Sequence, residues 1–209
     1  MIKSNRYLIV ASLIGIVSVV CLMILYRQIA LTSMVDHETR SNEAITELLS
    51  KAVRPSYLEL IERGSNIEAR ERSQIIGSLH AEVERLTRKS RLLKVKIYNP
   101  DGMTIFSTDA SQVGEDKSDN EGFLCAMEGH TLSNITFRDE FDAFEKKFSN
   151  VNVVSSYIGI YGETIAGTEG KPEAVFEVYS DVTDLYLQMQ RTQWLIIIGV
   201  LGSTAYRSA

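Results

Sequence analysis

The chain has 209 residues, with 22 basic and 27 acidic side chains and a formal net charge of −5 at pH 7. Four of the basic residues (Lys3, Arg6, Arg27 and Arg207) border two apolar ends, whereas every acidic residue lies between Arg27 and Trp194. The middle of the chain is therefore strongly acidic, which argues against nucleic acid and anionic lipid as its partners. Its length of about 165 residues is enough for one hydrophobic core.

The first apolar stretch, residues 7–26, contains no charged residue and twelve Leu, Ile and Val side chains. At about 1.5 Å per residue it spans a hydrocarbon layer of roughly 30 Å, which predicts a transmembrane helix. Lys3 and Arg6 favour a cytoplasmic tail over residues 1–6 and export of the chain beyond Arg27. A cleaved signal peptide is the alternative, but its apolar core is usually about 7 to 15 residues long and precedes a small-residue cleavage site.

A second apolar stretch occupies residues 194–206 and is followed by Arg207. It is shorter than the roughly 20 residues that a standard span needs. The sequence therefore predicts an incomplete second transmembrane segment. The alternative is an apolar helix that packs on the soluble part of the chain or lies in the membrane interface.

The first half of the exported region has helical periodicity and predicts a helical stalk over 27–92. No glycine or proline occurs between Tyr26 and Arg54, so the first helix is expected to leave the membrane without a break. Pro55 is expected to interrupt this helix, because the residue before a proline avoids helical angles. A further helix with one apolar stripe is expected from about Ile67.

The second half of the exported region has the alternation and turn residues typical of strands. The turn sequence NPDG at 99–102 joins the first two strands into a hairpin. Expected strands are 95–98, 103–107, 135–137, 152–161 and 174–179, with a short helix at 121–128 and a glycine-rich loop at 162–172. The fold class is α+β, an antiparallel sheet of about five strands whose first hairpin is covered by N-terminal helices. Ser180 or Asp181 is expected to cap the helix after the last strand.

Four segments resemble one family: 95–108 (VKIYNPDGMTIFST), 114–116 (GED), 155–158 (SSYI) and 175–183 (VFEVYSDVT). They are similar to the PAS-like (PDC or Cache-type) extracytoplasmic sensor regions of bacterial transmembrane sensor histidine kinases, diguanylate cyclases and chemoreceptors. The resemblance implies a PAS-like sensor core over 93–183 and a signalling helix over 184–193. Ser180, Asp181 and Thr183 resemble the signalling junction, where carboxylate and hydroxyl groups bind free backbone groups and fix the strand-to-helix angle.

By resemblance, such a protein senses a small molecule in a concave pocket of the sheet, usually as a homodimer, with its main domain on the periplasmic side of the bacterial inner membrane. The resemblance also implies an output domain after a second span, so the sequence is expected to be the input half of a receptor. It is either a truncated gene product or a short sensor with a separate partner. A membrane-tethered dimeric scaffold without a small-molecule ligand is the alternative function.

The sequence contains no arrangement of residues that predicts catalysis, a metal site or a cofactor. Arg138 is the best candidate for binding a ligand, because it directly follows a strand and an arginine can hold a carboxylate bidentately. Tyr157 and Tyr179 alternate with apolar neighbours on later strands and are expected to close over a ligand. The alternatives are a surface ion pair of Arg138 with Asp139 or Glu140, and ordinary core tyrosines.

Overall fold

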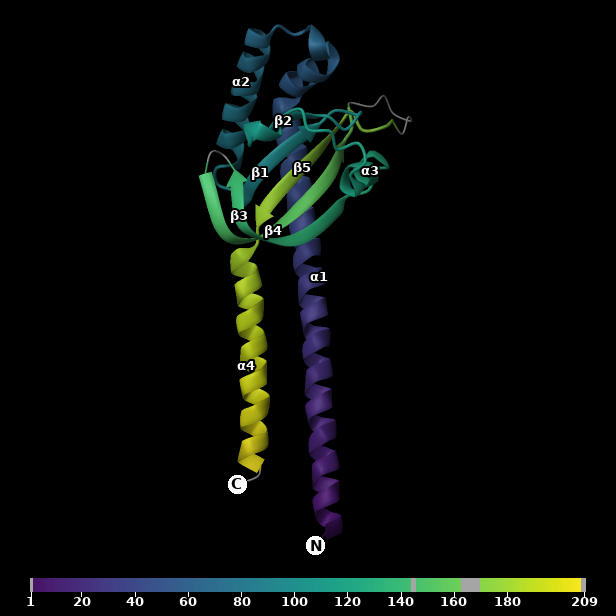
Figure 1. Ribbon diagram of the computed structural model, residues 1–209, viewed down its shortest axis with the longest axis vertical. Coiled ribbons are helices and arrows are strands. Elements are labelled where there is room, and N and C mark those ends of the chain that lie inside the picture. The colour runs from purple at the N-terminus through teal and green to yellow at the C-terminus, as the bar shows by residue number, and fades with distance from the viewer. Residues whose placement is uncertain (1, 144–145, 163–169, 208–209) are drawn as a thin grey trace. The chain divides into compact units, whose positions relative to one another are not determined.

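The computed structural model describes residues 2–143, 146–162 and 170–207. The chain divides into two units (Figure 1): Met1–Met34 with Asp184–Ala209, and Val35–Thr183, which contains the sheet. Part of the expected glycine-rich loop at 162–172 lies outside the described residues.

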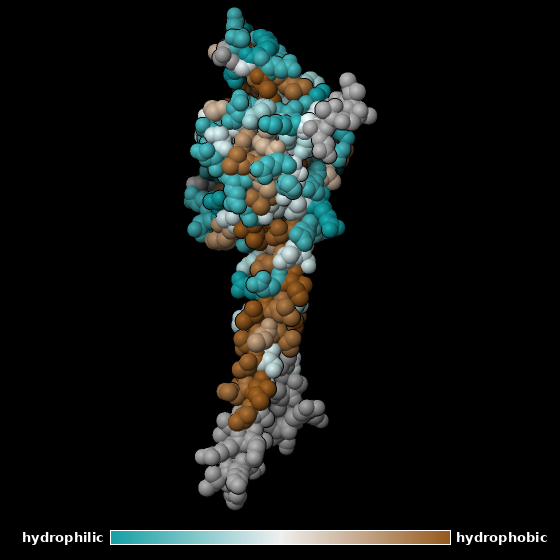
Figure 2. All heavy atoms as spheres, turned by 90° about the vertical axis from the view of Figure 1, so that its right-hand side faces the viewer, coloured by the Kyte–Doolittle hydropathy of each residue, from teal (hydrophilic) through white to brown (hydrophobic). Residues whose placement is uncertain are grey.

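The first unit contains the N-terminal half of helix α1, Ile2–Arg63, and nearly all of helix α4, Thr183–Arg207. Figure 2 shows hydrophobic side chains covering the described surface of these helices, and the large apolar residues there are mostly exposed. Among the described residues, one helix is long and apolar enough to cross a membrane, and it contains most of the predicted span. The stretch 194–206 lies in α4, and its entry into a membrane stays a prediction.

Helix α1 continues from the apolar stretch into the sheet-containing unit as a single helix of 62 residues. The expected continuity is therefore confirmed, and the expected interruption at Pro55 is wrong. A proline inside a helix costs about 3 kcal/mol because it removes one backbone hydrogen bond. Pro55 is exposed, whereas the helix stripe around it is buried, so tertiary packing offsets this cost. That stripe contains Leu49, Val53, Tyr57 and Leu60.

A 3₁₀ turn, Gly64–Asn66, reverses the chain into helix α2, Ala69–Thr87. Leu79 and Val83 form the buried part of the apolar stripe that the sequence predicts for this helix. Both helices pack on one face of the sheet, where they share a core with Phe106 and Phe176.

The sheet is antiparallel and has five strands in the order β2-β1-β5-β4-β3. The strands are β1 Leu92–Tyr98, β2 Thr104–Ser107, β3 Leu132–Ala143, β4 Lys146–Ile160 and β5 Ala174–Asp181, and the short helix α3 spans Glu121–Met127. The α+β fold class, the hairpin and the short helix are therefore confirmed. The structure corrects the expected lengths of β3 and β4, which pair with each other along eleven residue pairs.

The two faces of the sheet differ in chemistry because strand residues alternate between them. On β5, Phe176 and Val178 face α1 and α2, while Glu177 and Tyr179 lie on the opposite face. The helix-covered face also has one buried polar contact. Asn42 of α1 accepts a hydrogen bond from Ser180 and donates one of 2.9 Å to Ser156 on the neighbouring strand β4.

Candidate functional site

A polar cavity of about 210 Å³ lies on the sheet face that α1 and α2 leave uncovered. Two apolar clusters flank this face: one joins α3 to the sheet through Phe123, and the other contains Phe141 near the far end of β3. The residues that line the cavity are Asn120, Glu121, Gly122, Leu132, Asn134, Thr136, Arg138, Val153, Ser155, Tyr157, Glu177 and Tyr179.

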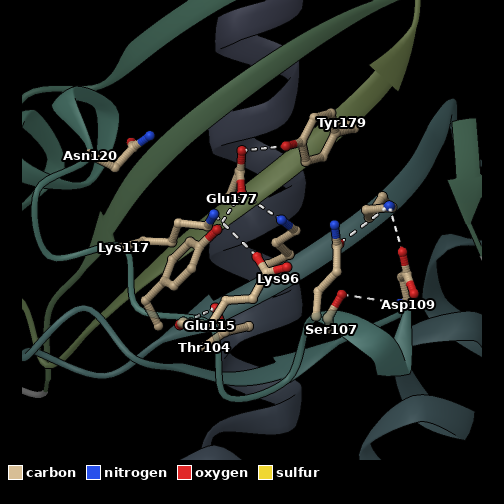
Figure 3. Close-up of polar contacts among 12 residues, drawn as sticks. Lys96, Thr104, Ser107, Asp109, Glu115, Lys117, Asn120, Glu177 and Tyr179 are labelled. Atoms are coloured by element: carbon tan, nitrogen blue, oxygen red, sulfur yellow. Dashed lines mark hydrogen bonds and ion pairs between the residues drawn. The ribbon is translucent and has the colours of Figure 1, made fainter. Parts of the chain in front are cut away.

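Glu177, in the middle of β5, is the buried charge of this cavity and is 2% exposed. Its carboxylate accepts a hydrogen bond of 2.5 Å from the Tyr179 hydroxyl and another from Tyr98 on β1. Tyr157 on β4 is the register partner of Glu177, and its hydroxyl is close enough for the charge of Glu177 to raise its pKa. Figure 3 shows Glu177 between Tyr179 and Lys96, whose Nζ lies 3.7 Å from Glu177 Oε2. A buried carboxylate is thus compensated by phenols and one lysine.

Burial raises the pKa of Tyr98, Tyr157 and Tyr179 well above the usual range of a phenol, and the negative charge of Glu177 raises it further. The three hydroxyls therefore keep their protons. Burial lowers the pKa of Lys96, against the opposing effect of Glu177. These directions follow from the cost of an uncompensated charge away from water.

A second lysine on β1, Lys94, lies on the same side of the sheet and is engaged elsewhere. Its Nζ lies 3.2 Å from Asp109 Oδ2, and it is also 4.7 Å from the centre of the Phe141 ring. Lys94 therefore balances its own charge near the second apolar cluster. It does not line the cavity.

Arg138 lies at the other end of the cavity, on the exposed edge strand β3. Within the described part of the chain, its guanidinium forms no hydrogen bond or salt bridge, so the surface pairs weighed for it are not formed there. It is close enough to Tyr179 to lower that pKa slightly. The cavity thus has a buried carboxylate at one end and, among the described residues, an unengaged guanidinium at the other.

The structure brings the three expected ligand-binding residues together, because Arg138, Tyr157 and Tyr179 all line this one cavity. Glu177 was not among the residues expected from the sequence. A signal for it exists: Glu177 is the one charged residue in the otherwise uncharged run 174–180 (AVFEVYS). A charge in the middle of a buried strand marks either a paired structural group or a binding site.

The expected signalling junction lies at the end of β5. The Asp181 carboxylate accepts a hydrogen bond of 2.9 Å from the backbone N–H of Thr183, the first residue of α4. The Thr183 hydroxyl accepts one of 3.0 Å from the backbone N–H of Asn152 on β4. Ser180 instead faces α1 and binds Asn42. The first turn of α4 is therefore held by side chains from the junction.

No protein-family model matches this sequence, and no curated protein matches it. Similar solved structures include the sensory domain of the Campylobacter jejuni chemoreceptor Tlp3 with isoleucine bound. That domain is 16% identical, with 82% of this chain and 62% of that one covered and a TM-score of 0.44. The E. coli DcuS sensor domain is 15% identical over 70% of this chain and 98% of that one, with a TM-score of 0.37.

The V. cholerae histidine kinase DctB sensor domain is 11% identical over 76% of this chain and 60% of that one, with a TM-score of 0.38. This chain thus spans less than two thirds of the Tlp3 and DctB domains that it matches. At these identities and scores, a functional conclusion has to rest on this chain's own residues. The three neighbours are the sensory domain of a chemoreceptor and two sensor domains, one of them from a histidine kinase.

Proposed function

We propose that this chain is a membrane-anchored sensor module that binds a small molecule on the outer side of the bacterial inner membrane and has no catalytic role itself. The observation that carries this proposal is that Arg138, Tyr157 and Tyr179 line one polar cavity. Arg138 is the group that holds an anionic part of the ligand, such as a carboxylate, because a guanidinium pairs with it bidentately. The two tyrosines flank the ligand.

The route of the signal is the second part of the proposal. Glu177 and Tyr179 precede the junction Ser180, Asp181 and Thr183 on the same strand, and Thr183 begins α4. A ligand that moves β5 therefore acts on the hydrogen bonds at the first turn of α4. The motion then passes along the signalling helix and the second apolar segment that the sequence predicts. A homodimer is the expected assembly.

A ligand screen on the full chain in detergent tests the binding function. Carboxylates, amines and sugars are added and the melting temperature is measured, since a ligand that binds the folded state raises it. We expect at least one anionic compound to raise it, and Arg138→Ala to abolish the effect. The control is Arg70→Ala, an exposed arginine on α2 outside the cavity. The absence of any stabilising compound favours the scaffold without a ligand.

The location is tested separately, by adding protease to intact inner-membrane preparations that expose the outer side. We expect cleavage within residues 28–190, because the flanking charges favour a cytoplasmic N-terminus. Protection of that region in intact preparations, with cleavage after detergent is added, overturns the orientation.

A further inference from the structure

The Tyr179 hydroxyl, at the end of the cavity around Glu177, can accept hydrogen bonds from a ligand but has no hydrogen left to donate to it. A tyrosine hydroxyl has one hydrogen, and those of Tyr98 and Tyr179 are donated to the Glu177 carboxylate. Tyr179 therefore presents only lone pairs to a ligand.

The same end of the cavity also carries an excess of negative charge. A carboxylate has about four acceptor sites, and the hydroxyls of Tyr98 and Tyr179 occupy two of those of Glu177. Lys96 forms an ion pair with Glu177 at 3.7 Å, which balances one of the two carboxylates at this end but is beyond hydrogen-bond distance and leaves acceptor sites of Glu177 open. Glu121 of α3 lines the cavity as well, and it forms no salt bridge or side-chain hydrogen bond within the described residues. A ligand group with N–H donors and a positive charge fits this end.

The strand register separates this end from Arg138. Glu177 pairs with Tyr157, which pairs with Leu132, so these three residues form one row across the sheet. Arg138 lies six residues further along β3, a distance of roughly 20 Å at about 3.3 Å per residue. The row of Tyr179 lies between them. Extended side chains close only part of this separation, so the positive and negative ends of a ligand have to be well apart.

We infer that the cavity binds an ω-amino acid, a molecule with a primary ammonium group at one end and a carboxylate at the other. The ammonium lies against Glu177 and the oxygen of Tyr179, and the carboxylate lies against Arg138. An α-amino acid carries both groups on one carbon and cannot reach both ends. The cavity of about 210 Å³ has room for roughly seven water molecules, which matches a short chain of this kind. The inference rests on the proposed function, which assigns the carboxylate to Arg138.

A series of related compounds tests this on the full chain in detergent, with dissociation constants from calorimetry. The compounds are ε-aminocaproate, its isomer norleucine, caproate without an amine, and adipate with two carboxylates. We expect ε-aminocaproate to bind about tenfold more tightly than each of the others, or better. Caproate and adipate have no ammonium group to bind Glu177, and norleucine cannot reach Glu177 and Arg138 at the same time. If norleucine binds as tightly as ε-aminocaproate, or more tightly, the ammonium and carboxylate of the ligand do not need to be far apart, and the inference is overturned. Equal or tighter binding of adipate or caproate overturns the ammonium site.

Substitutions then assign the effect to Glu177. Glu177→Gln keeps the shape but removes the charge, so ε-aminocaproate is expected to bind it no better than caproate. Glu128→Gln, an exposed glutamate outside the cavity, is the matched control and is expected to keep the preference. Should Glu177→Gln fail to fold, the exposed Glu121→Gln is expected to reduce the preference for ε-aminocaproate over caproate, and an unchanged preference counts against the inference.

The test separates this inference from the proposed function. If adipate or caproate binds best and Arg138→Ala abolishes that binding, the sensor function stands and the ω-amino acid is excluded. If none of the four compounds binds, the ω-amino acid is again excluded, and the wider ligand screen decides the sensor function.

Discussion

Gly122 lies in the lining of the candidate cavity and marks where helix α3 comes closest to the sheet. A Cβ atom built on it would lie 2.3 Å from Cδ2 of Tyr157, much closer than two carbon atoms approach in folded proteins. The missing side chain therefore lets α3 rest directly on the tyrosine ring. Gly122 thus positions Tyr157, one of the expected ligand-binding residues.

We expect Gly122→Ala to lower the free energy of unfolding by about 1 to 3 kcal/mol, because the added methyl group must displace the ring or the helix. The measurement is urea unfolding of the full chain in detergent. Gly77→Ala on α2 is the control, since a Cβ there meets nothing within 4 Å. Alanine replaces glycine in a helix at that site and is expected to stabilise by about 0.5 to 1 kcal/mol. A neutral Gly122→Ala would show that α3 does not press on Tyr157.

At the scale of elements, α1 is attached to the sheet through a polar side chain as well as its apolar stripe. Asn42 is fully buried and bridges Ser180 of β5 and Ser156 of β4. These serines lie on the opposite face of the strands that carry Glu177 and Tyr157. The contact therefore couples α1 to the two strands that form the centre of the candidate site.

Asn42→Ala is expected to destabilise the chain by about 1 to 3 kcal/mol, because the buried Ser180 hydroxyl loses its acceptor and Ser156 keeps only its bond from Ser133. Thermal unfolding of the full chain in detergent measures the loss. Arg40→Ala, at an exposed position two residues earlier, is expected to change stability by less than about 0.5 kcal/mol. Equal effects of the two substitutions would contradict a specific role of the asparagine.

The uninterrupted course of α1 through Pro55 gives a third prediction. Pro55→Ala restores the backbone donor of the helix at an exposed site and is expected to raise stability by about 1 to 3 kcal/mol. Urea unfolding measures the gain. Reduced stability would mean that the proline is needed, for example to set the direction of the helix around Tyr57.

Elements that are determined by neighbouring residues could be predicted from the sequence, whereas elements that depend on distant segments could not. The hairpin was predictable because Asn99 and Gly102 favour a turn locally, and the structure has a 3.0 Å hydrogen bond from the Gly102 N–H to the Asn99 carbonyl. The full length of β3 was not predictable, because its second half (RDEFDA) is rich in charged residues. That half forms a strand because it pairs with β4. The helix through Pro55 depends likewise on the core that Tyr57 enters.

The candidate site was predictable only in part for a related reason. Arg138, Tyr157 and Tyr179 could be named from residue type and strand position, but their meeting in one cavity depends on strand order, which the local pattern does not contain. Glu177 appears as an isolated charge in an apolar strand. The three phenols around it come from β1, β4 and β5, so only the folded sheet assembles them.

At the scale of the whole molecule, the phenols around Glu177 couple folding to alkaline pH. Their pKa is raised in the folded chain, mainly by burial, above the ordinary value of 10.0 that applies when the chain unfolds. Above that pH the unfolded chain holds fewer protons than the folded one, so stability is present below about pH 10 and falls as pH rises further. Lys96 acts in the opposite sense, because its pKa is lowered in the folded chain.

We therefore expect the free energy of unfolding to fall above pH 10 by about 1.4 kcal/mol per pH unit for each of Tyr98, Tyr157 and Tyr179. Urea unfolding of the full chain at several alkaline pH values, followed by phenolate absorbance, measures both the loss and the protons released. Tyr98→Phe removes one phenol and is expected to reduce the slope by one such increment, whatever its effect on stability at neutral pH. An unchanged slope in Tyr98→Phe would show that this phenol is already ionised, or accessible, in the folded chain.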